Sequence, residues 1–151
     1  ERLIALLKDT DTLMFDRDEI TVPADTSLME EVQAFTEERL SRTDASFKTI
    51  MQIGLAVEEI FVNIADYAYV PGKGKASLRV EINEDPAEAV LTFTDSGIPY
   101  DPTAKEDPDV TLSAEERKIG GLGIYMTKQI MDHVSYERKD GRNILTLKKN
   151  I

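Results

Sequence analysis

Two side chains able to bind a cation and act as a base lie one helical turn apart in this sequence. Glu59 and Asn63 are separated by four residues within a segment of helical periodicity, so they share one face of the expected helix beside its apolar stripe. A carboxylate and an amide oxygen at that spacing can hold a hard cation and polarise a hydroxyl group or a water molecule. A solvated polar face would show the same spacing, so the pair alone does not establish a site.

A second candidate group begins at Asp95, which follows alternating apolar residues at Leu91 and Phe93. Period two places the Asp95 carboxylate on the same side as those two residues, toward the core. A carboxylate in that position needs a hydrogen-bond donor, and the exocyclic amine of a purine would serve. Gly97 would let the backbone approach a flat ligand closely. The alternative is a turn that merely caps the strand.

A third candidate group opens the last expected helix, at Gly120, Gly121, Leu122 and Gly123. Backbone N–H groups at a helix N-terminus, together with the positive end of the helix dipole, form a site for phosphate. Lys118 and Arg117 precede this group and could add positive charge to the same phosphates. The alternative is a flexible loop that ends where the helix begins.

Periodicity predicts the elements that would position these groups. Strands are expected at 19–22, 78–82 and 91–95, helices at about 25–40, at 46–69 and from 121, and a final hairpin at 134–138 and 143–148 around Asp140-Gly141. The stretch 98–120 loses this periodicity amid prolines and charges, and it predicts a mobile lid.

These elements predict an α+β two-layer sandwich, because helices and hairpins occur in clumps and do not alternate regularly. The expected sheet is mixed and mostly antiparallel, with helices covering one face. Residues 19–151 form the expected domain. Residues 1–18, which include a short amphipathic stretch at 1–8, are expected to be an N-terminal extension or linker.

Composition narrows the function classes. The chain has 151 residues, 41% of them hydrophobic, which suits a single domain with one core. The formal net charge of −11 makes nucleic acid and anionic membrane surfaces poor partners. The absence of Cys and the single His exclude disulfides, thiolate zinc sites and His-rich metal cages. No apolar run reaches the roughly 20 residues of a membrane span, so a cytoplasmic protein is expected.

The three groups, in this order, resemble the ATP-binding domain shared by gyrase, the Hsp90 chaperones, sensor histidine kinases and MutL, which has the Bergerat-type ATP-binding fold. The details are most similar to the bacterial anti-sigma factor serine-protein kinases. The similarity rests on Glu-x-x-x-Asn followed by Ala68-Tyr69, on the Asp-x-Gly-x-Pro-Tyr-Asp-Pro string at 95–102, and on Gly-Gly-Leu-Gly-Ile-Tyr at 120–125. It extends from about residue 19 to residue 149.

The resemblance implies a role for each candidate residue. Asn63 would ligate Mg²⁺, and Glu59 would be the general base for a serine hydroxyl. Asp95 would accept a hydrogen bond from the adenine amine, with Gly97 beside it. The glycine-rich group from Gly120 to Gly123, with Lys118, would bind phosphate. Where many relatives have a His after the Asn, this chain has Tyr67.

The function implied is that of an ATP-dependent protein serine/threonine kinase acting on a small anti-sigma-factor antagonist of the STAS type. A sigma factor is a further implied partner, and a homodimer is compatible with the family. The alternative is a regulatory binding module that is gated by nucleotide and has no kinase activity. A histidine kinase domain fits less well, because the single His, His133, follows the glycine-rich group. A gyrase-type ATPase would need a longer chain.

Overall fold

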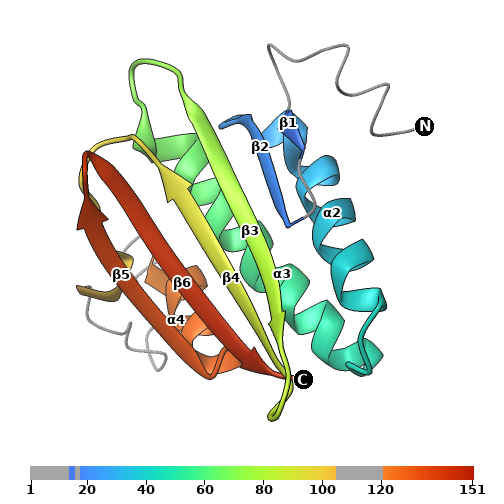
Figure 1. Ribbon diagram of the computed structural model, residues 1–151. Helices are drawn as coiled ribbons and strands as arrows, with labels where there is room; N and C mark the ends of the chain where they lie inside the picture. The colour runs from blue at the N-terminus through green and yellow to red at the C-terminus, as the bar shows by residue number, and fades with distance from the viewer. Residues whose placement is uncertain (1–13, 16–17, 105–120) are drawn as a thin grey trace.

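The computed structural model describes residues 14–15, 18–104 and 121–151, which form helices packed on one side of a sheet (Figure 1). The strands are β1 (Met14–Phe15), β2 (Glu19–Pro23), β3 (Lys75–Asn83), β4 (Glu88–Asp95), β5 (His133–Lys139) and β6 (Arg142–Asn150). The helices are α2 (Met29–Ser41), α3 (Phe47–Asn63) and α4 (Gly121–Ile130), with short helical turns η1 (Thr26–Leu28), η2 (Ile64–Ala68) and η3 (Pro102–Ala104).

The sheet has the strand order β1-β2-β3-β4-β6-β5, and each neighbouring pair that the structure describes is antiparallel. Figure 1 shows α2, α3 and α4 together behind the sheet, and no helix of the described residues covers the other face. The predicted two-layer α+β architecture is therefore confirmed. The last hairpin brings β6 back beside β4, so β4 lies between β3 and β6.

Side-chain periodicity explains why these layers pack together. Alternate residues of β4 are buried, and the apolar stripe of α3 faces them. The residues expected on that stripe are all buried: Ile53, Val57, Ile60, Ile64 and Ala68. Burial of such side chains contributes roughly 1.5–3 kcal/mol each. The core thus fixes the orientation of α3, and with it the polar face that carries Glu59 and Asn63.

Local signals begin and end the elements. Asp25 caps η1 by accepting a hydrogen bond from the Ser27 N–H at 2.9 Å, and this bond lowers the pKa of the Asp25 carboxyl. Ser46 caps α3 by accepting from the Thr49 N–H at 3.1 Å. The predicted helix at 46–69 is nearly continuous, but its last turn, η2, is a π-helix. The final hairpin turns at Asp140 and Gly141, whose φ angles are 51° and 76°.

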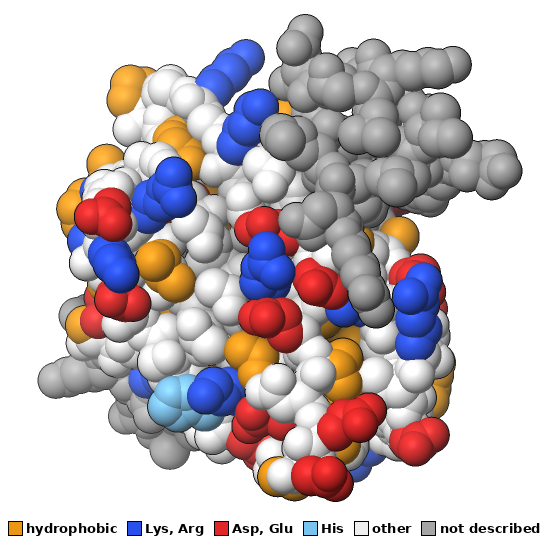
Figure 2. All heavy atoms as spheres, viewed as in Figure 1, with side chains coloured by type: hydrophobic (Ala, Val, Ile, Leu, Met, Phe, Trp, Pro, Cys, Tyr) orange, Lys and Arg blue, Asp and Glu red, His pale blue; other side chains and the backbone are white. Residues whose placement is uncertain are grey.

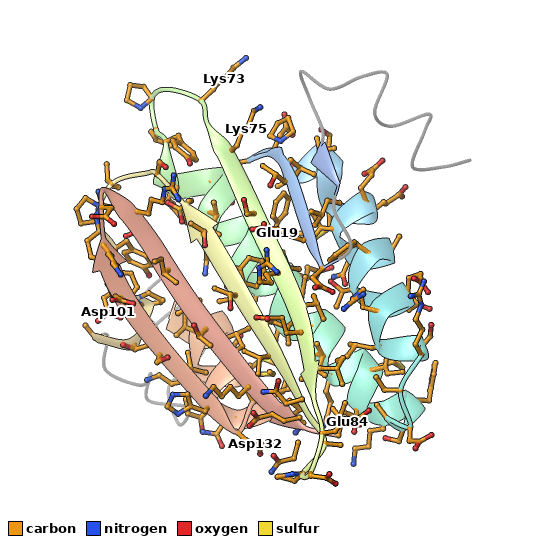
Figure 3. All side chains as sticks on the ribbon, viewed as in Figure 1. Glu19, Lys73, Lys75, Glu84, Asp101 and Asp132 are labelled. Carbon is orange, nitrogen blue, oxygen red and sulfur yellow. The ribbon has the colours of Figure 1, made fainter. Side chains whose placement is uncertain are left out.

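Charged side chains are interleaved on the face of the sheet opposite the helices, where Figure 2 shows acidic and basic groups side by side. Arg79 Nη2 lies 3.2 Å from Glu19 Oε1 across the β2–β3 pair. Figure 3 places Lys73 and Lys75 at one end of the sheet and Glu84 and Asp132 at the other. Because Ala76 pairs with Asp95, β4 ends at the lysine-bearing end.

Several predictions concern residues outside the described ranges. These are the short amphipathic stretch at 1–8 and most of the lid, including Arg117, Lys118 and Gly120. Of the proposed N-terminal extension, Met14 and Phe15 pair with β2 as a short edge strand. Within the ranges that the structure describes, no helix is long and apolar enough to cross a membrane.

Candidate functional site

A cleft opens where α3 and η2 pass over the ends of β4 and β6. It encloses about 570 Å³, part of it open to solvent. Apolar side chains line most of it, including Ile60, Ile64, Phe93, Ile124 and Leu145, and aromatic rings are contributed by Tyr67, Tyr100 and Tyr136. Three polar groups enter this apolar lining, from Asn63, Asp95 and Asn143. An apolar slot with a few polar groups is typical of a site for a flat organic ligand.

Asp95 is one of those polar groups, and its side chain faces inward as the alternation of β4 predicts. It is only 7% exposed. Its Oδ1 atom accepts hydrogen bonds from the Gly97 N–H and from Asn143 Nδ2, each at 2.9 Å. The donor that the buried carboxylate needs is therefore supplied largely by Asn143, its direct cross-strand partner on β6.

Asn143 was not among the candidate residues found in the sequence. A signal was present, because period two places Asn143 on the same face of its strand as Leu145 and Leu147, which are buried. A polar residue on an apolar strand face requires a partner. The sequence does not say that β6 pairs with β4, so the partner could not be named.

Gly97 is required by a close approach within the protein. A Cβ atom at this position would lie 2.3 Å from the carbonyl oxygen of Ala68. The next residue, Ile98, donates its N–H to that same oxygen at 2.9 Å. The segment after β4 is thereby held against η2, which forms one wall of the cleft.

Tyr69 connects the end of η2 with the start of β3 and with the residue after β4, and it too was missed as a site residue. Its hydroxyl donates to the Lys75 carbonyl at 2.5 Å and accepts from the Ser96 N–H at 2.7 Å. Burial is the main reason why the pKa of Tyr69 lies above its ordinary value, and the nearby Asp95 charge acts in the same direction. The hydroxyl is therefore neutral when it makes these bonds.

Glu59 meets the glycine-rich start of α4. A Cβ atom at Gly123 would lie 1.9 Å from Cδ of Glu59 and 2.2 Å from each of its carboxylate oxygens. Only glycine leaves room for the carboxylate in this position. Two candidate groups that are far apart in the sequence are thus brought into contact.

Asn63 lies one turn after Glu59 and lines the cleft. Its Nδ2 atom is buried and has no hydrogen-bond partner among the described residues. Rotation of the amide exchanges its nitrogen and oxygen, so the same side chain can present an oxygen ligand. A buried polar atom left without a partner is the observation expected if Asn63 contacts a ligand.

The glycine-rich group itself is described in part. Gly121 and Leu122 form the first residues of α4, with Gly123 next, while Gly120 and Lys118 lie outside the described ranges. No cluster of three or more His, Asp or Glu side chains able to hold a metal occurs in the described part of the chain. Magnesium sites commonly combine one or two protein oxygens with water and substrate phosphates, so Asn63 fits such a site.

Comparison with known proteins agrees with this geometry. The family "Histidine kinase-like ATPase domain" matches residues 22–149. Serine/threonine-protein kinase BtrW from Bordetella bronchiseptica is 33% identical over 93 residues, which cover 62% of this chain and 65% of that protein. Serine-protein kinase RsbW from Halalkalibacterium halodurans is 29% identical over 127 residues, 82% of this chain and 76% of that protein.

A solved structure shows the same fold. A chain in the crystal structure of the SiaB–SiaC complex from Pseudomonas aeruginosa has a TM-score of 0.57 and 20% sequence identity, with coverage of 99% of this chain and 98% of that one. The family match spans most of the chain and includes α3, the end of β4 and the start of α4. The chain therefore belongs to the histidine kinase-like ATPase domain family, which implies that it binds ATP.

Proposed function

We propose that this chain is a cytoplasmic protein serine kinase that phosphorylates a small anti-sigma-factor antagonist of the STAS type. The observation that carries the proposal is the contact of the Glu59 carboxylate with Gly123 at the start of α4. It puts a potential general base beside a helix N-terminus suited to phosphate. The names of BtrW and RsbW as serine or serine/threonine kinases support the same activity.

Each candidate residue has a role in this proposal. The adenine of ATP would occupy the apolar cleft, with its amine donating to Asp95. Gly97 keeps the segment after β4 close to η2. Backbone N–H groups around Gly121, Leu122 and Gly123 would bind the phosphates, and Gly120 and Lys118 are proposed to assist them. Asn63 would hold Mg²⁺, which when bound supplies positive charge to the phosphates.

The proposed step needs no covalent enzyme intermediate. Glu59 accepts the proton of the serine hydroxyl as the serine oxygen forms a bond to the γ-phosphorus. The bond between the γ-phosphorus and the β–γ bridging oxygen breaks, and ADP is the leaving group. Phosphoryl transfer depends mainly on positioning and charge neutralisation. In this proposal the residues of the site supply the positioning, and Mg²⁺ with the backbone N–H groups of α4 would neutralise the charge.

The adjacent glutamates allow a matched test. Glu58 and Glu59 are neighbours on α3, but Glu58 is exposed, whereas Glu59 is partly buried with its carboxylate against Gly123. We expect label from γ-labelled Mg-ATP to appear on a serine of one candidate antagonist. Glu59→Gln should abolish transfer while ATP binding remains, and Glu58→Gln should transfer at the wild-type rate.

Two other outcomes would contradict the kinase activity or the assignment of its base. If ATP binds but no candidate antagonist is labelled, the chain is better described as a regulatory binding module gated by nucleotide. If Glu59→Gln and Glu58→Gln both transfer label normally, the kinase stands and the assignment of the base is wrong. A sigma factor and a second copy of the chain are proposed as further partners, to be tested by co-purification and by light scattering respectively.

A further inference from the structure

The buried Asn143 side chain makes hydrogen bonds through both its nitrogen and its oxygen. It is 6% exposed and lines the cleft, near the start of β6. Its Nδ2 atom donates to Asp95 Oδ1 at 2.9 Å and to the Ile98 carbonyl at 2.8 Å. Both N–H donors of the amide are therefore used, and one of them holds the carboxylate that faces the cleft.

The other end of the amide is equally occupied. Asn143 Oδ1 accepts from the Tyr136 hydroxyl at 2.5 Å, from Arg138 Nη1 at 3.2 Å and from the Tyr100 N–H at 3.3 Å. Arg138 Nη1 also donates to the Gly97 carbonyl at 2.8 Å. If the amide were rotated, its NH₂ group would face these donors and its oxygen would face the Asp95 carboxylate. The amide thus has one favourable orientation.

That orientation determines which oxygen of Asp95 is left for a ligand. Two donors, the Gly97 N–H and Asn143 Nδ2, both bind Oδ1. In the described part of the chain, no hydrogen bond occupies Oδ2. The carboxylate is thereby held as a fixed acceptor. A purine ring with an amine at position 6 would donate a hydrogen bond to this carboxylate, whereas a purine ring with a carbonyl oxygen there would be repelled.

From this arrangement we infer that Asn143 is a positioning residue that makes the cleft selective for 6-aminopurine nucleotides. The inference rests on the proposed nucleotide site and adds to it the residue that sets the preference for the base. Without Nδ2, Oδ1 keeps a single donor, and the carboxylate is free to turn. The cleft would then still accept a purine ring, but it would no longer distinguish the group at position 6.

The test compares ATP with purine riboside 5′-triphosphate, which lacks the 6-amine, by calorimetry on the same protein. The ratio of the two dissociation constants measures the contribution of the amine. Because both nucleotides meet the same folded molecules, a general loss of folded protein cancels in this ratio. We expect wild-type protein to prefer ATP by roughly ten- to a hundredfold, the range for a hydrogen bond to a charged group.

Two variants of nearly equal shape separate positioning from packing. Asn143→Val removes the donor, and the ratio should fall toward one. Asn143→Thr keeps a hydroxyl that can reach across the strand pair, as Thr21 Oγ1 reaches its cross-strand partner Ser77 Oγ at 3.0 Å. We expect it to restore part of the ratio. Asn150→Val, an exposed site on the same strand, should leave the ratio unchanged.

The outcomes distinguish this inference from the function on which it rests. If wild-type protein binds both nucleotides equally, the assignment of Asp95 to the adenine amine fails. If wild-type protein prefers ATP and Asn143→Val retains the full preference, Asn143 has no positioning role. Should Asn143→Val fail to fold, Arg138→Gln replaces it, because Arg138 is exposed and holds the Asn143 oxygen. A severalfold fall in the ratio then supports the inference, and an unchanged ratio overturns it.

Discussion

At the scale of single residues, two asparagines that line the same cleft differ in their hydrogen bonding. Asn143 uses both ends of its amide, whereas Asn63 has a buried Nδ2 atom with no partner among the described residues. Leaving a buried donor without a partner costs about 1–3 kcal/mol. The contrast indicates that Asn143 belongs to the scaffold of the site and that Asn63 is available to a ligand.

This contrast predicts the effect of Asn63→Ala. We expect calorimetry to show that magnesium-dependent ATP binding is lost. Thermal stability should be unchanged or slightly higher, because the amide makes no hydrogen bond through Nδ2 and Ala favours helix. Asn83→Ala, at the exposed end of β3, is the matched control and should bind ATP normally. Unaltered ATP affinity and magnesium dependence in Asn63→Ala would remove Asn63 from the metal site.

The raised pKa of Tyr69 predicts that the free energy of unfolding falls at alkaline pH. Burial raises the pKa of Tyr69 in the folded chain, so the unfolded chain ionises first, near pH 10. The stabilisation is complete below that pH and is lost as pH rises toward the folded-state pKa. Tyr69→Phe should unfold more easily at pH 8, since Ser96 and Lys75 lose a hydrogen-bond partner. Denaturant titrations should show the gap to wild type narrowing above pH 10, and a constant gap would contradict the argument.

At the scale of elements, the site depends on close contacts between segments. The segment after β4 lies against η2, and the first turn of α4 lies against α3. Glycine makes both contacts possible, at Gly97 and Gly123. The obstacle to a side chain differs between them, because Gly97 faces the backbone of Ala68 whereas Gly123 faces the flexible end of Glu59.

Substitutions at Gly97 and at Gly54, a glycine inside α3, should have opposite effects on stability. Gly97→Ala forces a Cβ atom to within 2.3 Å of a backbone oxygen, and we expect it to destabilise the fold by about 1–3 kcal/mol. Gly54→Ala places its Cβ at an ordinary 3.5 Å from Gln33 within α3 and should stabilise the fold by about 0.5–1 kcal/mol. Chemical denaturation measures both. Equal effects would show that helix propensity and packing do not explain these glycines.

At the scale of the whole molecule, the cleft draws on both layers of the fold. Ligand binding there should stabilise the folded chain as a unit, since the unfolded chain has no cleft. The polar groups come from one helix, α3, and two strands, β4 and β6, which meet only when the chain is folded. The overall negative charge of −11 opposes a phosphate ligand, so attraction must come from local groups.

Thermal unfolding gives a direct test at this scale. Mg-ATP at about 100 times its Kd should add about 2.7 kcal/mol to the free energy of unfolding. For a chain of this size that corresponds to a rise in Tm of roughly 5 to 10 °C. In Asp95→Asn a tenfold weaker affinity at the same concentration would reduce the gain to about 1.4 kcal/mol. An equal shift in both proteins would show that Asp95 does not contact the nucleotide.

Much of the fold could be predicted from the sequence because periodicity and capping are local properties. The buried stripe from Ile53 to Ala68 and the inward direction of Asp95 follow from the spacing of neighbouring residues. The change from α-helix to π-helix at η2 could not be predicted, because a π-helical turn gives no signal in that spacing. The roles of Glu59 as a base and of Asn63 as a metal ligand remain predictions. The position of Glu59 beside the start of α4 and the position of Asn63 in the cleft agree with these roles.

The sequence by itself determined which residues face the core and where chemistry could occur. Only the tertiary structure decided which of those residues meet. Asp95 and Asn143 are 48 positions apart and are joined because β6 pairs with β4, and Glu59 reaches Gly123 because α3 and α4 pack on the same face of the sheet. The physical reason is that side-chain direction depends on local backbone geometry, whereas strand pairing and helix packing depend on the free energy of the whole chain.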